Sequence, residues 1–84
     1  HELGWSPAGD AIVEGSRALR SLNRMLSLDF PIDGPKTLNG LILEHSQAIP
    51  ESGTSIKLAG DAAEVLHTQD RSVVTVRIFR PEAH

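Results

Sequence analysis

The sequence contains no cysteine, so neither a disulfide framework nor a thiolate zinc site can form. It has little aromatic surface, because one tryptophan and two phenylalanines are its whole aromatic complement. Eight lysines and arginines are interspersed with eleven aspartates and glutamates, which gives a formal net charge of −3. A base-stacking platform and a basic groove for nucleic acid are therefore not expected, and we predict no nucleic-acid partner.

The sequence also lacks a long hydrophobic run. Its longest one is Leu41-Ile42-Leu43, far below the roughly 20 apolar residues of a membrane-spanning helix. We therefore expect no direct membrane insertion. The first residue is His1 rather than methionine, so we expect a fragment of a longer polypeptide. Its 84 residues are enough for one domain with a thin core.

The first half of the chain predicts a strand followed by a helix. Residues 11–14 have the composition of a short strand. Leu19, Leu22 and Leu26 recur at helical spacing, so we expect a helix over residues 19–27 with these leucines on its buried face.

A proline-containing loop and a second helix are expected next. The loop contains Phe30 and Ile32, which we expect to tuck into the core. Thr37 is a good N-cap for a helix over residues 38–47. The glycine at position 40 costs this helix about 1 kcal/mol relative to alanine. Its presence indicates the close approach of another backbone, most simply a strand that crosses the helix.

The second half predicts three strands, over residues 54–59, 62–68 and 72–80, joined by short turns. Side chains of the last strand alternate between a core face and an outer face. The expected core set is Val74, Val76 and Ile78, and the expected outer set is Val73, Thr75, Arg77 and Phe79.

These elements give an α+β fold of order β-α-α-β-β-β, in which two helices pack on one face of a mainly antiparallel sheet. We assign residues 1–10 to a linker or lead-in, 11–80 to the domain and 81–84 to a tail. The outer set is the candidate interaction surface, because an exposed valine and phenylalanine flank an arginine. The alternative is that these side chains cover loops of the domain itself.

The motifs of known catalytic sites are missing from the sequence. It contains no H-x-x-x-H pair, no G-x-S-x-G elbow and no glycine-rich phosphate loop. We therefore predict no catalytic and no cofactor-binding residues, and the protein is not expected to be an enzyme. Asp29 and Asp33 are the only candidate ligands for a hard cation such as Mg²⁺ or Ca²⁺. The alternative is a solvated loop in which Asp33 forms a turn.

Several short segments follow one another in a characteristic order and spacing. They are Val13-Glu14-Gly15, Leu19, Leu22-Asn23, Pro31, Thr37-Leu38, Gly40-Leu41, Ile49-Pro50, Gly53, Glu64-Val65-Leu66 and residues 74–80. In these segments, from about residue 11 to 80, the chain resembles the CorC/HlyC family of transporter-associated domains. It departs from the family at Ala63, where an aromatic residue is common, and at Glu14, which is often aspartate.

The resemblance implies the C-terminal domain of a bacterial protein of magnesium and cobalt efflux, or of a hemolysin-like protein. Such domains follow a pair of CBS domains and a membrane domain, which would be the partners of this chain. A homodimer remains open. The fold is expected to resemble part of the FAD-binding oxidoreductase domains, but without a flavin, because the chain is too short to enclose one.

The implied function is non-catalytic regulation of ion transport through docking on neighbouring domains or subunits. The implied location is cytoplasmic, at the inner face of the bacterial plasma membrane through the parent protein. Two alternatives stay open: a direct sensor of a divalent cation or a nucleotide, and the C-terminal domain of a cation/proton antiporter.

Overall fold

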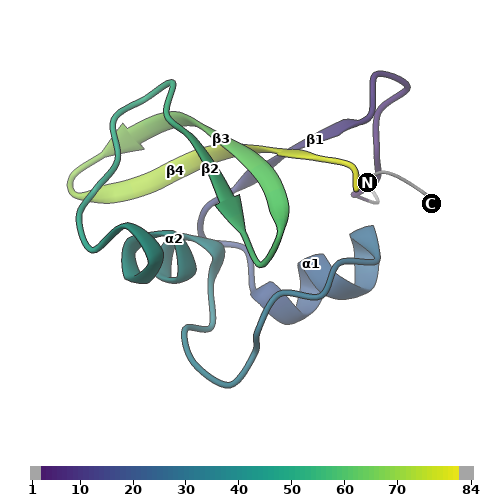
Figure 1. Cartoon of the computed structure of the whole chain (residues 1–84), viewed down its shortest axis with the longest axis horizontal. Coiled ribbons are helices and arrows are strands. Elements are labelled where there is room, and N and C mark those ends of the chain that lie inside the picture. Colours follow the sequence, from purple (N-terminus) through teal and green to yellow (C-terminus); the bar gives the residue numbers. More distant parts are fainter. Residues whose placement is uncertain (1–2, 82–84) are drawn as a thin grey trace.

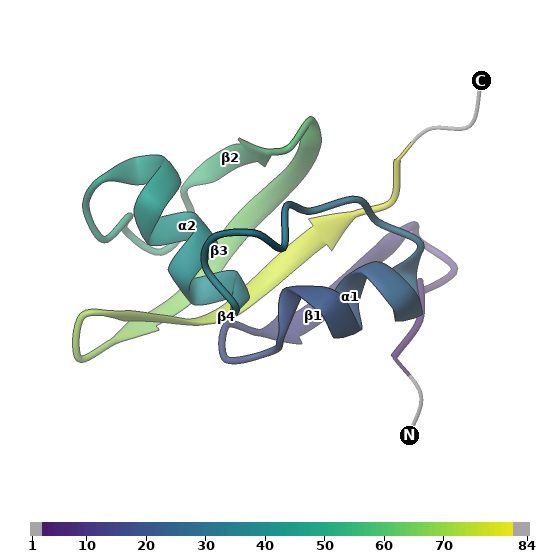
Figure 2. The same cartoon turned by 90° about the horizontal axis from the view of Figure 1, so that it is seen from below.

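The computed structural model describes residues 3–81. All neighbouring strands are antiparallel, and their order across the sheet is β1-β4-β3-β2. Figures 1 and 2 show both helices on the same face of this sheet. The predicted α+β arrangement and element order are therefore confirmed. The elements are β1 (Asp10–Glu14), α1 (Leu19–Leu26), α2 (Leu38–Ser46), β2 (Ser55–Leu58), β3 (Asp61–Gln69) and β4 (Ser72–Phe79).

The lead-in before β1 is attached to the rest of the domain. The indole Nε1 of Trp5 donates a hydrogen bond to the carbonyl of Leu26 at the end of α1, at 3.2 Å. The amide of Arg80 donates to the carbonyl of Gly9 at 2.8 Å, next to the first residue of β1. Parts of the predicted lead-in and tail, at residues 1–2 and 82–84, lie outside the described residues. Within residues 3–81, no helix is long and apolar enough to cross a membrane.

The core lies between the sheet and the two helices, and every buried side chain among the described residues is apolar. The predicted leucine stripe of α1 is confirmed, since its three members are almost completely buried. The loop after α1 contributes Phe30, which is 2% exposed. The full set is Ala11, Val13, Leu19, Leu22, Leu26, Leu28, Phe30, Leu38, Leu41, Ile42, Leu58, Ala63, Val65, Val73, Val76 and Ile78.

The side chain of Asn23 holds the loop after α1 against the helix. Its Oδ1 accepts a hydrogen bond from the amide of Phe30 at 2.8 Å, and its Nδ2 donates to the carbonyl of Phe30 at 2.9 Å. Both hydrogen bonds hold the loop at Phe30, and neither involves the residues after it. The prediction that Ile32 enters the core is wrong, because this side chain, beyond the anchor, is 51% exposed.

Thr37 caps α2 as predicted, because its Oγ1 accepts a hydrogen bond from the amide of Gly40 at 3.1 Å. The expectation that a strand crosses the helix at Gly40 is wrong. A Cβ at that position would meet the side chain of Pro35, at 3.1 Å, rather than another strand. The close approach of two backbones is at Gly15 instead, where a Cβ would lie 1.9 Å from the carbonyl oxygen of Val73.

Three short hydrogen bonds surround this approach and join β1, α2 and β4. The amide of Gly15 donates to the carbonyl of Val74, and the amide of Asn39 donates to the carbonyl of Gly15, both at 2.7 Å. The Oδ1 of Asn39 accepts from the amide of Val73, also at 2.7 Å. The side chain of Asn39 on α2 thus accepts the hydrogen bond of the Val73 amide on β4, in place of a carbonyl of a neighbouring strand.

The pairing of β3 with β4 is irregular next to this network. Thr68 pairs with Val73 and His67 pairs with Thr75, so Val74 has no partner in the register. Such a bulge reverses the alternation of side chains, so that residues on its two sides differ by one position in the face that they occupy. The predicted outer position of Val73 is therefore wrong, since its side chain is 2% exposed. The predicted core position of Val74 is also wrong, since it is only half-buried.

We predict that Gly15→Ala lowers the free energy of unfolding by about 3 kcal/mol, because the added methyl group overlaps a backbone carbonyl that cannot move freely. Urea denaturation followed by circular dichroism measures this change. Gly34→Ala is the matched control, because nothing lies within 4 Å of an added Cβ there. It should change the stability by less than about 0.5 kcal/mol. Equal effects of the two substitutions would contradict the packing described here.

Candidate functional site

The face of the sheet opposite the helices is organised around Arg77, in the middle of β4. In the register, this residue lies opposite Ile12 of β1 and Glu64 of β3. Its Nη1 lies 3.4 Å from Oε1 of Glu64, and its Nε lies 3.3 Å from Oδ2 of Asp10. The contact of Nε is ionic only, because this buried atom has no hydrogen-bond partner. One guanidinium thus ties three strands together across the outer face.

Two large apolar side chains flank the arginine on this face. Ile12 is 56% exposed and Phe79 is 38% exposed. Phe79 was expected here, whereas Ile12 was missed. The alternation of β1 could have revealed it, because Ala11 and Val13 face the core. We call Ile12, Arg77 and Phe79 the outer sheet face; of the predicted surface residues, Thr75 also lies here and Val73 does not.

The candidate cation ligands are not brought together with further ligands. Asp29 and Asp33 are both exposed. Within residues 3–81, no group of three or more histidine, aspartate or glutamate side chains could hold a metal ion. The negative charge of Asp29 instead acts on Asp61, the first residue of β3. Asp61 follows a two-residue turn at Ala59 and Gly60, both with positive φ, whereas the sequence predicted this turn one residue later.

Burial of the Asp61 carboxyl raises its pKa above the ordinary value of 3.8, and the negative charge of Asp29 raises this pKa further. Both effects disfavour the ionised form in the folded state. The stabilisation from the protonated carboxyl is complete below pH 3.8 and is lost as the pH rises through the raised pKa. At neutral pH the ionised Asp61 therefore destabilises the fold.

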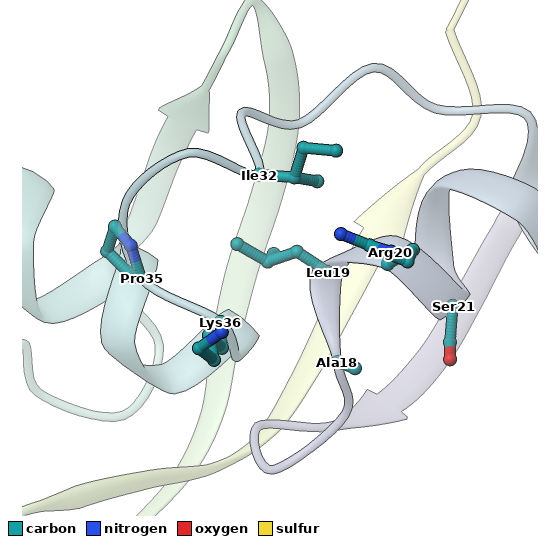
Figure 3. Close-up of a pocket in the computed structure, with 7 residues that line it drawn as sticks. All are labelled: Ala18, Leu19, Arg20, Ser21, Ile32, Pro35 and Lys36. Carbon is teal, nitrogen blue, oxygen red and sulfur yellow. The ribbon is translucent and has the colours of Figure 1, made fainter.

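A groove lies on the helical side of the molecule, beside the start of α1. Its volume is about 370 Å³, and its walls come from α1 and from the loop before α2. Figure 3 shows the side chain of Ile32, on the loop, beside those of Leu19 and Arg20 at the start of α1. Sequence reasoning missed the groove because it assigned Ile32 to the core. The lining residues are Ala18, Leu19, Arg20, Ser21, Ile32, Pro35 and Lys36, and we call them the basic groove.

We predict that Asp61→Asn raises the urea midpoint of unfolding at about pH 7, because an amide at this position carries no charge to desolvate or repel. The difference from the unmodified chain should shrink as the pH falls and vanish below pH 3.8. Asp29→Asn should give a smaller gain with the same pH dependence. Glu51→Gln, on an exposed loop, is the control. A gain that does not depend on pH would refute the electrostatic explanation.

Comparison with known proteins assigns the chain to a family. The family model of the CorC_HlyC transporter associated domain matches residues 6–82. A UPF0053 protein of Haemophilus influenzae is 33% identical over 72 residues, which is 86% of this chain and 17% of that protein. The UPF0053 inner membrane protein YfjD of Escherichia coli is 31% identical over 71 residues, or 84% of this chain and 17% of that protein. The chain thus spans about a sixth of the length of these relatives.

Solved structures have the same fold. A functionally unknown conserved protein from Haemophilus influenzae superposes with a TM-score of 0.85 at 32% identity, covering 90% of this chain and 94% of its own. A putative Mg²⁺ and Co²⁺ transporter (CorC) associated region from Neisseria meningitidis gives 0.82 at 14% identity, with 96% and 100% coverage. A Xylella fastidiosa hemolysin domain, in complex with Mg²⁺ and Mn²⁺, gives 0.80 at 17% identity, with 98% and 100% coverage. This chain belongs to the CorC_HlyC family of transporter associated domains.

Proposed function

We propose that this domain is a non-catalytic docking module of a bacterial magnesium or cobalt transport or efflux protein. In this proposal, the outer sheet face binds a neighbouring CBS-domain pair, the membrane domain or a second subunit of the parent protein. Three findings support it: the family membership, the short span of the chain within its relatives, and an Escherichia coli relative that is an inner membrane protein.

The observation that carries the proposal is the exposure of Ile12, on β1 directly opposite a paired arginine, and of Phe79, two residues further along β4. Full burial of a large apolar side chain stabilises a contact by about 1.5–3 kcal/mol. Because Arg77 is already held by Asp10 and Glu64, little side-chain entropy is lost when a partner covers it. The face therefore offers two apolar side chains beside a preorganised arginine, and aromatic residues and arginine are both enriched at interfaces.

Docking of this kind would modulate transport by a shift of population. A partner surface that the domain contacts in only one state of the transporter stabilises that state. A tenfold shift requires a difference in binding of only about 1.4 kcal/mol, which is comparable to covering the exposed parts of both apolar side chains. No chemistry at the domain itself is needed.

The test uses Ile12→Ser and Phe79→Ser, since a serine avoids placing a second carboxylate opposite Asp10. We expect each variant to bind the CBS-domain pair of the parent protein about tenfold more weakly in calorimetry, or to lose self-association in sedimentation. Met25→Ser is the matched control, because Met25 is 39% exposed and lies on α1, away from the outer sheet face. Equal binding by all three variants would remove the proposal, provided that their circular dichroism matches that of the unmodified chain.

Direct sensing of a divalent cation is the second candidate. The observation that favours it is the electrostatic interaction of Asp29 with Asp61, since proteins usually bind Mg²⁺ through one or two carboxylates. The binding of Mg²⁺ and Mn²⁺ to the Xylella fastidiosa domain agrees with it.

For this candidate, we expect millimolar Mg²⁺ to shift the amide NMR signals around residues 29 and 61. Asp29→Asn should abolish these shifts, because it removes one of the two carboxylates. Asp33→Asn tests the pair that the sequence predicted, and should have no effect if Asp29 and Asp61 are the ligands. A spectrum that Mg²⁺ leaves unchanged would eliminate sensing by this domain.

A further inference from the structure

The geometry points to a second binding site on the other side of the molecule: we propose that the basic groove binds an acidic peptide segment that carries aliphatic side chains. The groove is separate from the outer sheet face, because it is lined by α1 and by the loop before α2. Its volume of about 370 Å³ lies at the lower end of the range of about 300–1,000 Å³ for ligand pockets. This size suits one or two side chains of a peptide.

The walls of the groove are mainly apolar. Ile32 is 51% exposed although it belongs to a chain with few large exposed apolar residues. Figure 3 shows it across the opening from Leu19, which is itself 1% exposed and closes the floor. An aliphatic side chain of a ligand that enters the groove would cover the exposed part of Ile32. Its own apolar surface and that of Ile32 would both be removed from water.

The rim of the groove is positively charged. Arg20 and Lys36 both line it and both are exposed. Within the part of the chain that the structure describes, the only ion pairs shorter than 4.0 Å are those of Arg77, so neither rim residue has a carboxylate partner. Arg24 lies one helical turn beyond Arg20 on the same side of α1 and extends the positive strip.

The start of α1 adds to the positive potential. Its N-cap residue, Ala18, offers no side-chain hydrogen bond, and its first turn contains no acidic residue. The two walls of the groove are fixed to each other, because the amide of Leu19 donates to the carbonyl of Lys36 at 2.8 Å. The site is therefore preformed, so a ligand does not have to organise it.

An acidic, aliphatic peptide fits these features better than other anions. None of the lining residues is aromatic, so a nucleotide base has nothing on which to stack. Inorganic phosphate would leave the apolar walls unused. In an acidic, aliphatic peptide, the carboxylates would pair with Arg20 and Lys36 at the rim, and the aliphatic side chain would pack against the apolar walls.

The test is an amide NMR titration of the 84-residue chain with a capped hexapeptide that has two central leucines between pairs of glutamates. We expect localised shifts at residues 18–21 and 32–36. The double variant R20Q/K36Q should bind about tenfold more weakly, since it removes two exposed ion pairs. Ile32→Ser should weaken binding about fivefold through loss of apolar contact. Lys57→Gln, on β2, removes one positive charge outside the groove and should bind like the unmodified chain.

Four comparison probes decide between occupants. A peptide with glutamine for glutamate and one with serine for leucine should both bind more weakly, because each removes one half of the recognition. Equal binding by the serine peptide or by sodium phosphate would overturn the proposal in favour of an unspecific anion. Vesicles of phosphatidylglycerol that displace the peptide would overturn it in favour of a membrane. Absence of localised shifts with the leucine peptide at about 2 mM would leave the groove without this function.

Discussion

The backbone of Gly15 runs so close to the carbonyl of Val73 that no side chain fits between them, and the rest of the fold depends on this contact. It brings the end of β1 against β4 and leaves one donor of β4 unpaired in the sheet. Asn39, in the first turn of α2, accepts that donor. Two strands and one helix therefore meet at a single point, where each backbone group has a partner.

The same point determines which side chains reach the outer sheet face. The bulge at Val74 sends Val73 into the core, and Val76 and Ile78 follow on the inner side. Arg77 and Phe79 are thereby left on the outer side, next to Ile12. A strictly regular β4 could not bury Val73 together with Val76, because side chains alternate with a period of two. The bulge at Val74 thus determines which side chains of β4 enter the core and which ones form the candidate docking surface.

The local features of this fold could be predicted from the sequence, and the non-local ones could not. The leucine stripe of α1 and the Thr37 cap depend on residues within one or two helical turns, so their patterns are visible in the sequence. The bulge depends on Asn39, which is 34 residues from Val73 in the chain. The basic groove depends likewise on how a loop packs beside α1, and the interaction of Asp29 with Asp61 depends on a turn elsewhere in the sequence.

The outer sheet face is on the sheet and the basic groove is on the helical side of the molecule. Hydrogen bonds nevertheless connect the segments that carry the two surfaces. Beside the basic groove, the amide of Leu38 donates to the carbonyl of Arg17 at 3.0 Å. The next residue, Asn39, bonds to β1 and β4, the two strands that carry the outer sheet face. A partner in the groove would therefore contact residues next to the start of α2, and the start of α2 is hydrogen-bonded to β4 through Asn39. Because closely packed elements resist continuous deformation, a domain with both proposed partners bound would act as a rigid connector that holds them at a fixed distance and orientation.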